Sequence, residues 1–164
     1  MLEARLAGGP EPDVPNGGGL GVPRGEFVTL RAGGELRGCI GHVPADRPLV
    51  DVVAQMAVAA GLEDPRFPPV SATELAAVRI EISAVTELVR VAQPDPGSIV
   101  PGRDGLIVRQ GVCQGLLLPQ VATECGWDGE ALLAATCCKA GLSPDAWREP
   151  GIELYAFQAE VFSE

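Results

Sequence analysis

Residues 26–41 read EFVTLRAGGELRGCIG, and this stretch decides the fold. Apolar and polar residues alternate through 26–31 and again through 35–41, which is typical of β-strands with two different faces. Between them, Gly33 and Gly34 can adopt the positive φ angles that a tight turn needs. The stretch therefore predicts a β-hairpin.

Helices and strands follow the hairpin in an irregular order. Pro48 can open a helix, since apolar residues recur at helical spacing through 49–60. Asp128 can cap a second helix that runs to about Gly141. Strands are predicted at 78–82, 105–109, 115–118 and 152–162. Because no regular βαβ alternation occurs, the order favours an α+β fold with a mostly antiparallel sheet and flanking helices.

The length and composition indicate a single globular domain over residues 1–164. A chain of 164 residues with 46% hydrophobic residues can bury a core without disulfides or metals. Residues 8–25 are rich in Gly and Pro and predict a surface loop, and residues 2–6 predict the last turn or two of a helix.

The charge and the cysteines bound the possible functions. A net charge of −10 disfavours nucleic-acid and membrane-surface binding. No apolar run approaches the roughly 20 residues of a membrane span, and no signal peptide is recognisable, so we expect a cytoplasmic protein. The five cysteines show no CxxC spacing, which predicts free thiols and neither a metal site nor a cofactor.

The second strand of the hairpin carries the candidate catalytic group. Arg37 and Cys39 are two residues apart and share one face of the strand, where a guanidinium would favour the reactive thiolate. The alternative is that Cys39 is a packed apolar residue and Arg37 a structural ion-pair partner. Gly38 and Gly41 leave room for a ligand or another backbone. His42 could serve as a base for Cys39 only if the chain turns at Gly41.

A proline-bounded loop at 64–69 carries a second pair of candidates. Asp64 and Arg66 could hold the carboxylate or phosphate of a ligand. They could equally form an internal clamp, with Phe67 filling the core. Ser71 and Glu74 have capping-box spacing and predict a short helix after the loop.

The LRGCIG motif at residues 36–41 resembles the hallmark of the AMMECR family, the relatives of the AMME syndrome candidate gene 1 protein. The likeness continues at residues 27–30, 64–69 (DPRFPP), 117–121, 139–142 with 145–147, and 153–155. These blocks cover the chain from about residue 24 to residue 162.

The resemblance implies an α+β fold with an antiparallel sheet and two lobes that meet at a cleft. It assigns Arg37, Gly38, Cys39 and Gly41, with Asp64 and Arg66, to that cleft. It supplies no reaction, but it implies work in a multi-protein pathway beside a Memo-like protein and a radical SAM protein. Family members begin with a longer helix, so residues 1–25 read as a loop-rich segment with a truncated leading helix. His42 stands where the family has a small hydroxyl residue.

Three functions are compatible with the sequence. The protein could be a binding module for a small anionic molecule, a peptide or a protein, in which Arg37 and Arg66 supply affinity. It could be a cysteine-dependent enzyme that uses Cys39 on a small anionic substrate. It could also be a scaffold in which the motif is only structural. The sequence favours the binding module, because no base is evident beside Cys39.

Overall fold

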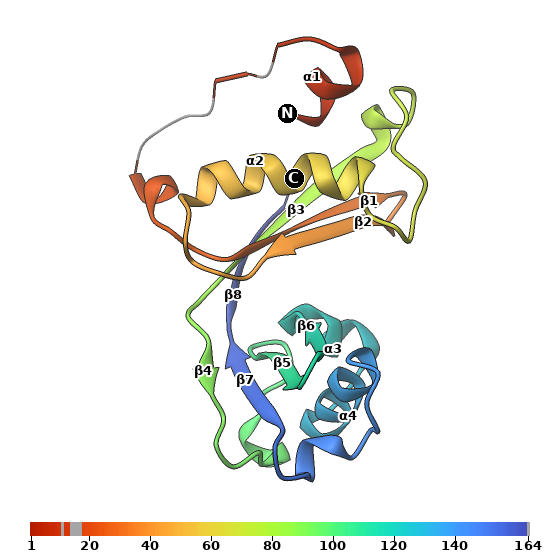
Figure 1. Cartoon of the computed structure of the whole chain (residues 1–164). Helices are drawn as coiled ribbons and strands as arrows, with labels where there is room; N and C mark the ends of the chain where they lie inside the picture. The colour runs from red at the N-terminus through yellow and green to blue at the C-terminus, as the bar shows by residue number, and fades with distance from the viewer. Residues whose placement is uncertain (11, 14–17, 164) are drawn as a thin grey trace. The chain divides into compact units, whose positions relative to one another are not determined.

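The computed structural model describes residues 1–10, 12–13 and 18–163. The chain forms two compact units, each with its own four-stranded antiparallel sheet (Figure 1). Unit 1 comprises Met1–Val85 and the residues from Glu160 on, and unit 2 comprises Thr86–Ala159. The predicted α+β class and antiparallel pairing are therefore confirmed.

The predicted hairpin forms the centre and one edge of the sheet in unit 1. Strands β1 (Glu26–Ala32) and β2 (Glu35–His42) pair antiparallel across Gly33 and Gly34, whose φ angles are +60° and +87°. The strand order is β2-β1-β3-β8, where β3 is Val78–Val85 and β8 is Ala159–Ser163. Strand β2 is thus an edge strand.

Helix α2 (Leu49–Leu62) covers one face of this sheet (Figure 1). Its apolar side packs on the strands in a core that includes Val28, Leu30, Val52, Met56 and Ala60. The approach is closest at Gly38, where an added Cβ would overlap the carbonyl oxygen of Ala60. Helix α1 (Leu2–Ala7) joins the same core through the buried Leu2.

Unit 2 has the strand order β4-β7-β5-β6. The strands are β4 (Val89–Arg90), β5 (Gly105–Gln110), β6 (Cys113–Leu117) and β7 (Glu153–Phe157). Helices α3 (Pro119–Cys125) and α4 (Gly129–Lys139) pack on this sheet. Asp128 caps α4 as predicted, since its Oδ1 accepts the Ala131 N–H at 2.8 Å.

Four short 3-10 helices complete the described chain: η1 (Gly18–Gly21), η2 (Leu75–Ala77), η3 (Pro96–Ser98) and η4 (Ala146–Arg148). The short helix predicted after Ser71 is η2. None of the helices among the described residues is long and apolar enough to cross a membrane.

The structure corrects the sequence-based prediction in three places. The single strand predicted at 152–162 is two strands, because β7 pairs with β5 in one sheet whereas β8 lies beside β3 in the other. Alternation of residue types cannot show such a change of partner. Helix α3 and the two-residue strand β4 were not predicted, since each is too short to carry a clear period.

Candidate functional site

The Asp64 carboxylate and the Arg66 guanidinium cap the free edge of β2 at Cys39. Asp64 Oδ2 accepts the backbone N–H of Cys39 at 2.8 Å, and Arg66 Nη2 donates to the Cys39 carbonyl at 3.0 Å. Asp64 also binds Arg66 directly, with Nε at 2.9 Å, Nη2 at 2.6 Å and the backbone N–H at 3.1 Å. The pair occupies both outward-facing backbone groups of Cys39, as a neighbouring strand would.

Charge neutralisation within this pair limits what it can bind. The Asp64 side chain is only 2% exposed, and its hydrogen bonds from Arg66 hold its pKa well below the usual range. The same contact raises the pKa of Arg66. Both groups are therefore charged and mutually satisfied at neutral pH, which favours the clamp interpretation over a site for an anion.

Arg37 is engaged in the same way by Glu74. The Arg37 Nε donates to one Glu74 oxygen at 3.1 Å, and Nη2 donates to the other at 3.4 Å. This contact is the main cause that lowers the pKa of Glu74 to about 2. The sequence assigned Glu74 only to a capping box with Ser71, and those two hydrogen bonds are also present. The carboxylate thus fixes Arg37 as well as the turn.

Cys39 is half-buried. Its side chain lies on the face of β2 opposite α2, because the neighbouring residue Gly38 faces the helix and side chains alternate along a strand. The hydroxyl of Thr29, on β1, donates to its sulfur at 3.4 Å. Thr29 lies directly opposite Cys39 in the β1–β2 register. The polar partner of the thiol is therefore a hydroxyl that sequence reasoning did not single out, although cross-strand pairing in the hairpin could have shown it.

His42 does not meet Cys39. Side chains three residues apart on a strand point to opposite faces. The His42 Nε2 lies 2.7 Å from Asp46 Oδ1 in the following loop. The hydrogen bond from His42 lowers the pKa of Asp46, which keeps that carboxylate ionised. A Cys39–His42 pair of nucleophile and base is not formed.

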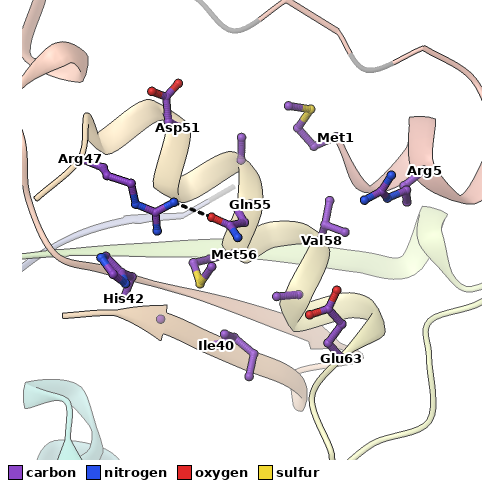
Figure 2. A pocket seen from close by; sticks show the side chains of 13 residues that line it. Met1, Arg5, Ile40, His42, Arg47, Asp51, Gln55, Met56, Val58 and Glu63 are labelled. Atoms are coloured by element: carbon purple, nitrogen blue, oxygen red, sulfur yellow. Dashed lines mark hydrogen bonds between the residues drawn. The ribbon is translucent and has the colours of Figure 1, made fainter. Parts of the chain in front are cut away.

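A pocket of about 660 Å³ lies between α2 and the edge of β2 (Figure 2). We call it the α2–β2 pocket. Three residues of β2 line it, Ile40, Gly41 and His42. The rest of the lining includes side chains of α2, among them Gln55 and Val58, and Met1 and Arg5 near the N-terminus. Within it, Arg47 Nη1 donates to Gln55 Oε1 at 2.7 Å. The volume falls in the range of small-molecule sites.

Glu26 is a buried carboxyl group at the start of β1. Its side chain is 0% exposed, and neither carboxyl oxygen has a hydrogen-bond partner among the described residues. Burial raises its pKa from 4.5 to about 8, against a smaller opposing effect of Arg47. Glu26 is therefore mostly neutral at pH 7. Sequence reasoning missed it, because a Glu at the start of a strand usually faces water.

Of the predicted site residues, the structure brings Cys39, Asp64 and Arg66 into direct contact and joins Arg37 to Glu74. Gly38, which has no side chain, allows α2 to pack closely on β2, and Gly41 lines the α2–β2 pocket. Within residues 1–10, 12–13 and 18–163, no three His, Cys, Asp or Glu side chains are grouped so that they could hold a metal ion.

Comparison with known proteins places the chain in a family. The AMMECR1 family model matches residues 2–162. A protein of Methanothermobacter thermautotrophicus is 50% identical over 86% of this chain and 76% of its own length. A protein of Methanosarcina acetivorans is 44% identical over 99% of this chain and 85% of its own length.

A solved structure shares the fold over nearly the whole chain. The crystal structure of an uncharacterised protein from Pyrococcus horikoshii has a TM-score of 0.94 and 42% identity, and the match covers 99% of this chain and 85% of that one. The family whose model matches is the one that the sequence resembles at its LRGCIG and DPRFPP motifs. The chain belongs to the AMMECR1 family.

Proposed function

We propose that the protein is a cytosolic binding module that acts with partner enzymes, and that its ligand docks in the α2–β2 pocket. The observation that carries this proposal is that the pocket joins an exposed side of α2 to the edge of β2 with both apolar and polar lining. Such a lining can bury an apolar group of a ligand and also orient its polar groups.

The contacts of Arg37 and Arg66 support binding over catalysis. Arg37 is held by Glu74, and Arg66 is held by Asp64. In both guanidinium groups the carboxylate engages Nε and Nη2, while the buried Nη1 of Arg37 has no hydrogen-bond partner among the described residues. His42, the one histidine of the chain, lies on the other face of the strand. The thiol therefore has no histidine beside it to serve as a base.

A pocket-blocking substitution tests this proposal. Gln55 is exposed and lines the pocket, so Gln55→Trp fills it without removing core packing. Glu35→Trp, at the exposed hairpin turn, is the matched control. Wild type and both variants are titrated by calorimetry with a fragment library and with purified Memo-like and radical SAM proteins of the same source. We expect Gln55→Trp to weaken binding on the order of tenfold or more, a loss of about 1.4 kcal/mol, and Glu35→Trp and Cys39→Ser to bind as wild type. Equal binding by Gln55→Trp and wild type would contradict the proposal.

One observation supports the cysteine-dependent enzyme as a second candidate. The Thr29 hydroxyl donates to the Cys39 sulfur, and the Arg66 guanidinium is fixed at the Cys39 carbonyl. The first contact places a hydrogen-bond donor at the sulfur, and the second places a cation beside the residue. Alkylation with iodoacetamide, read by peptide mass spectrometry, tests it, with exposed Cys125 and buried Cys137 as internal references. Faster reaction of Cys39 than of Cys125 would favour the enzyme, and a rate near that of Cys137 would exclude it.

A further inference from the structure

Within the part of the chain that the structure describes, the edge of β2 presents an unpaired backbone donor and acceptor beside the α2–β2 pocket. In an antiparallel ladder, the backbone groups of every second residue point away from the neighbouring strand. The bonds from Cys39 to Asp64 and Arg66 identify Cys39 as such a residue. Gly41, two residues further along β2, has the same orientation, and it pairs in register with Phe27 on β1.

The cap that protects Cys39 does not extend to Gly41. Among the described residues, no group outside the sheet binds the Gly41 N–H or carbonyl. Exposed strand edges are usually blocked by charged groups, bulges or covering loops, because unpaired backbone recruits another strand. Here Asp64 and Arg66 block one pair of groups and leave the next pair facing the pocket that Gly41 lines.

The side chains around Gly41 fit an extended chain. Residues of an added strand alternate between the two faces of the sheet. On the α2 side, such a residue would lie beside Ile40 of the pocket lining (Figure 2), which suits an apolar side chain. The next residue would point to the opposite face. The Asp64–Arg66 cap would end the pairing at Cys39, so the added strand would be short.

We propose that the α2–β2 pocket binds an extended peptide segment of a partner protein, which pairs with the Gly41 backbone at the edge of β2 and places one apolar side chain over Ile40. This inference rests on the proposed function and names its ligand class. Main-chain hydrogen bonds supply the affinity in such strand addition, and the pocket selects the side chain.

An N-methyl scan of selected peptides tests the backbone pairing. Peptides are selected from a random twelve-residue phage library on the immobilised wild-type protein, with Gln55→Trp used to discard peptides that bind elsewhere. Each backbone N–H of the best peptide is then methylated singly, and affinity is measured by fluorescence anisotropy. We expect one methylated position, whose N–H would otherwise donate to the Gly41 carbonyl, to lose on the order of tenfold in affinity, with little change at the neighbouring positions.

Amide exchange of Gly41, followed by NMR, gives an independent reading. The Gly41 amide should exchange rapidly in the free protein and on the order of tenfold more slowly with peptide bound. The Cys39 amide, already bonded to Asp64, should change little. Exchange of Gly41 that is unchanged by a bound peptide would overturn the inference.

The remaining outcomes separate this inference from the proposed function. Tolerance of methylation at every position, or losses at consecutive positions as for a helical peptide, would overturn strand addition while leaving the pocket as the binding site. Binding of fragments alone, still blocked by Gln55→Trp, would do the same. Protection of Gly41 that rises with protein concentration in the absence of peptide would assign the edge to a second copy of the chain and overturn a partner peptide. Binding insensitive to Gln55→Trp would remove both proposals.

Discussion

Asp64→Asn is the sharpest test of how the β2 edge is held. The Asp64 carboxylate accepts four hydrogen bonds, two at each oxygen. An amide keeps only one acceptor oxygen. If this oxygen stays with the Arg66 Nε and backbone N–H, the amide NH₂ faces the Cys39 N–H and Arg66 Nη2, which are both donors. At least two hydrogen bonds are therefore lost, and both involve a charged group.

The magnitude follows from which partners can reach water. A hydrogen bond to a charged group contributes about 1.5–3 kcal/mol. The Arg66 side chain is 51% exposed and can exchange its lost contact for water, so that bond is counted at no more than about 1 kcal/mol. The Cys39 N–H faces the buried amide and bears the full cost. We expect the free energy of unfolding of unit 1 to fall by about 2–4 kcal/mol.

The assay must report on unit 1. Both tryptophans, Trp127 and Trp147, lie in unit 2, so fluorescence follows that unit only. Urea unfolding monitored by far-UV circular dichroism, together with the exchange rate of the Cys39 amide, reports on β2 and α2. Asp46→Asn is the matched control, because Asp46 is exposed and its ion pair, screened by water, should contribute little to stability.

The dependence on pH provides an internal check. The folded-state pKa of Asp64 is lowered, so its contribution to stability is present above the unfolded pKa of about 3.9 and is lost as the pH falls below it. The stability difference between wild type and Asp64→Asn should shrink in acid. A difference below about 0.5 kcal/mol at pH 7, or an unchanged exchange rate at Cys39, would refute this account of the edge.

Three further substitutions test the remaining structural arguments. The folded-state pKa of Glu26 is raised to about 8, so its favourable effect is present below pH 4.5 and is lost as the pH rises toward 8. In urea unfolding, the free energy of unfolding of Glu26→Gln should therefore rise by about 2–3 kcal/mol relative to that of wild type as the pH increases from 5 to 7. A stability difference between the two proteins that does not change with pH would contradict the burial of Glu26. Gly38→Ala should destabilise unit 1 by about 3 kcal/mol in thermal unfolding, because its Cβ would overlap the backbone of α2, whereas Gly21→Ala, with open space around it, should not. Asp128→Ala should lower the stability of unit 2 by about 1 kcal/mol through loss of the α4 cap, measured by tryptophan fluorescence, and no change would show that the cap is dispensable.

The hairpin, helix α2 and the cap of α4 could be predicted from the sequence, because each is encoded by residues close together in the chain. Alternation over 26–41, an apolar face over 49–60 and Asp128 at a helix start are local patterns, and the structure confirms all three. The family could also be recognised from its motifs. Unpredicted elements such as α3 and β4 are too short for a period to stand out.

The partners of the motif residues could not be predicted, because they come from parts of the chain far from the motif. Asp64 reaches the Cys39 backbone across 25 residues, and Glu74 reaches Arg37 across 37. Nothing in residues 36–41 indicates which distant side chain will satisfy an edge strand. Whether Arg37 and Arg66 are available to a ligand depends entirely on these contacts.

By itself, the sequence determined the α+β class, the hairpin and the two motifs that carry the candidate residues, LRGCIG and DPRFPP. The hydrophobic period and the turn residues that predict them are properties of short stretches of chain. Only the tertiary structure decided that Arg37 and Arg66 are paired, that Glu26 is buried and uncharged, and that Gly41 faces a pocket beside α2. The physical reason is that hydrogen-bond satisfaction and burial depend on how the chain returns on itself, and a linear pattern of residue types does not specify that path.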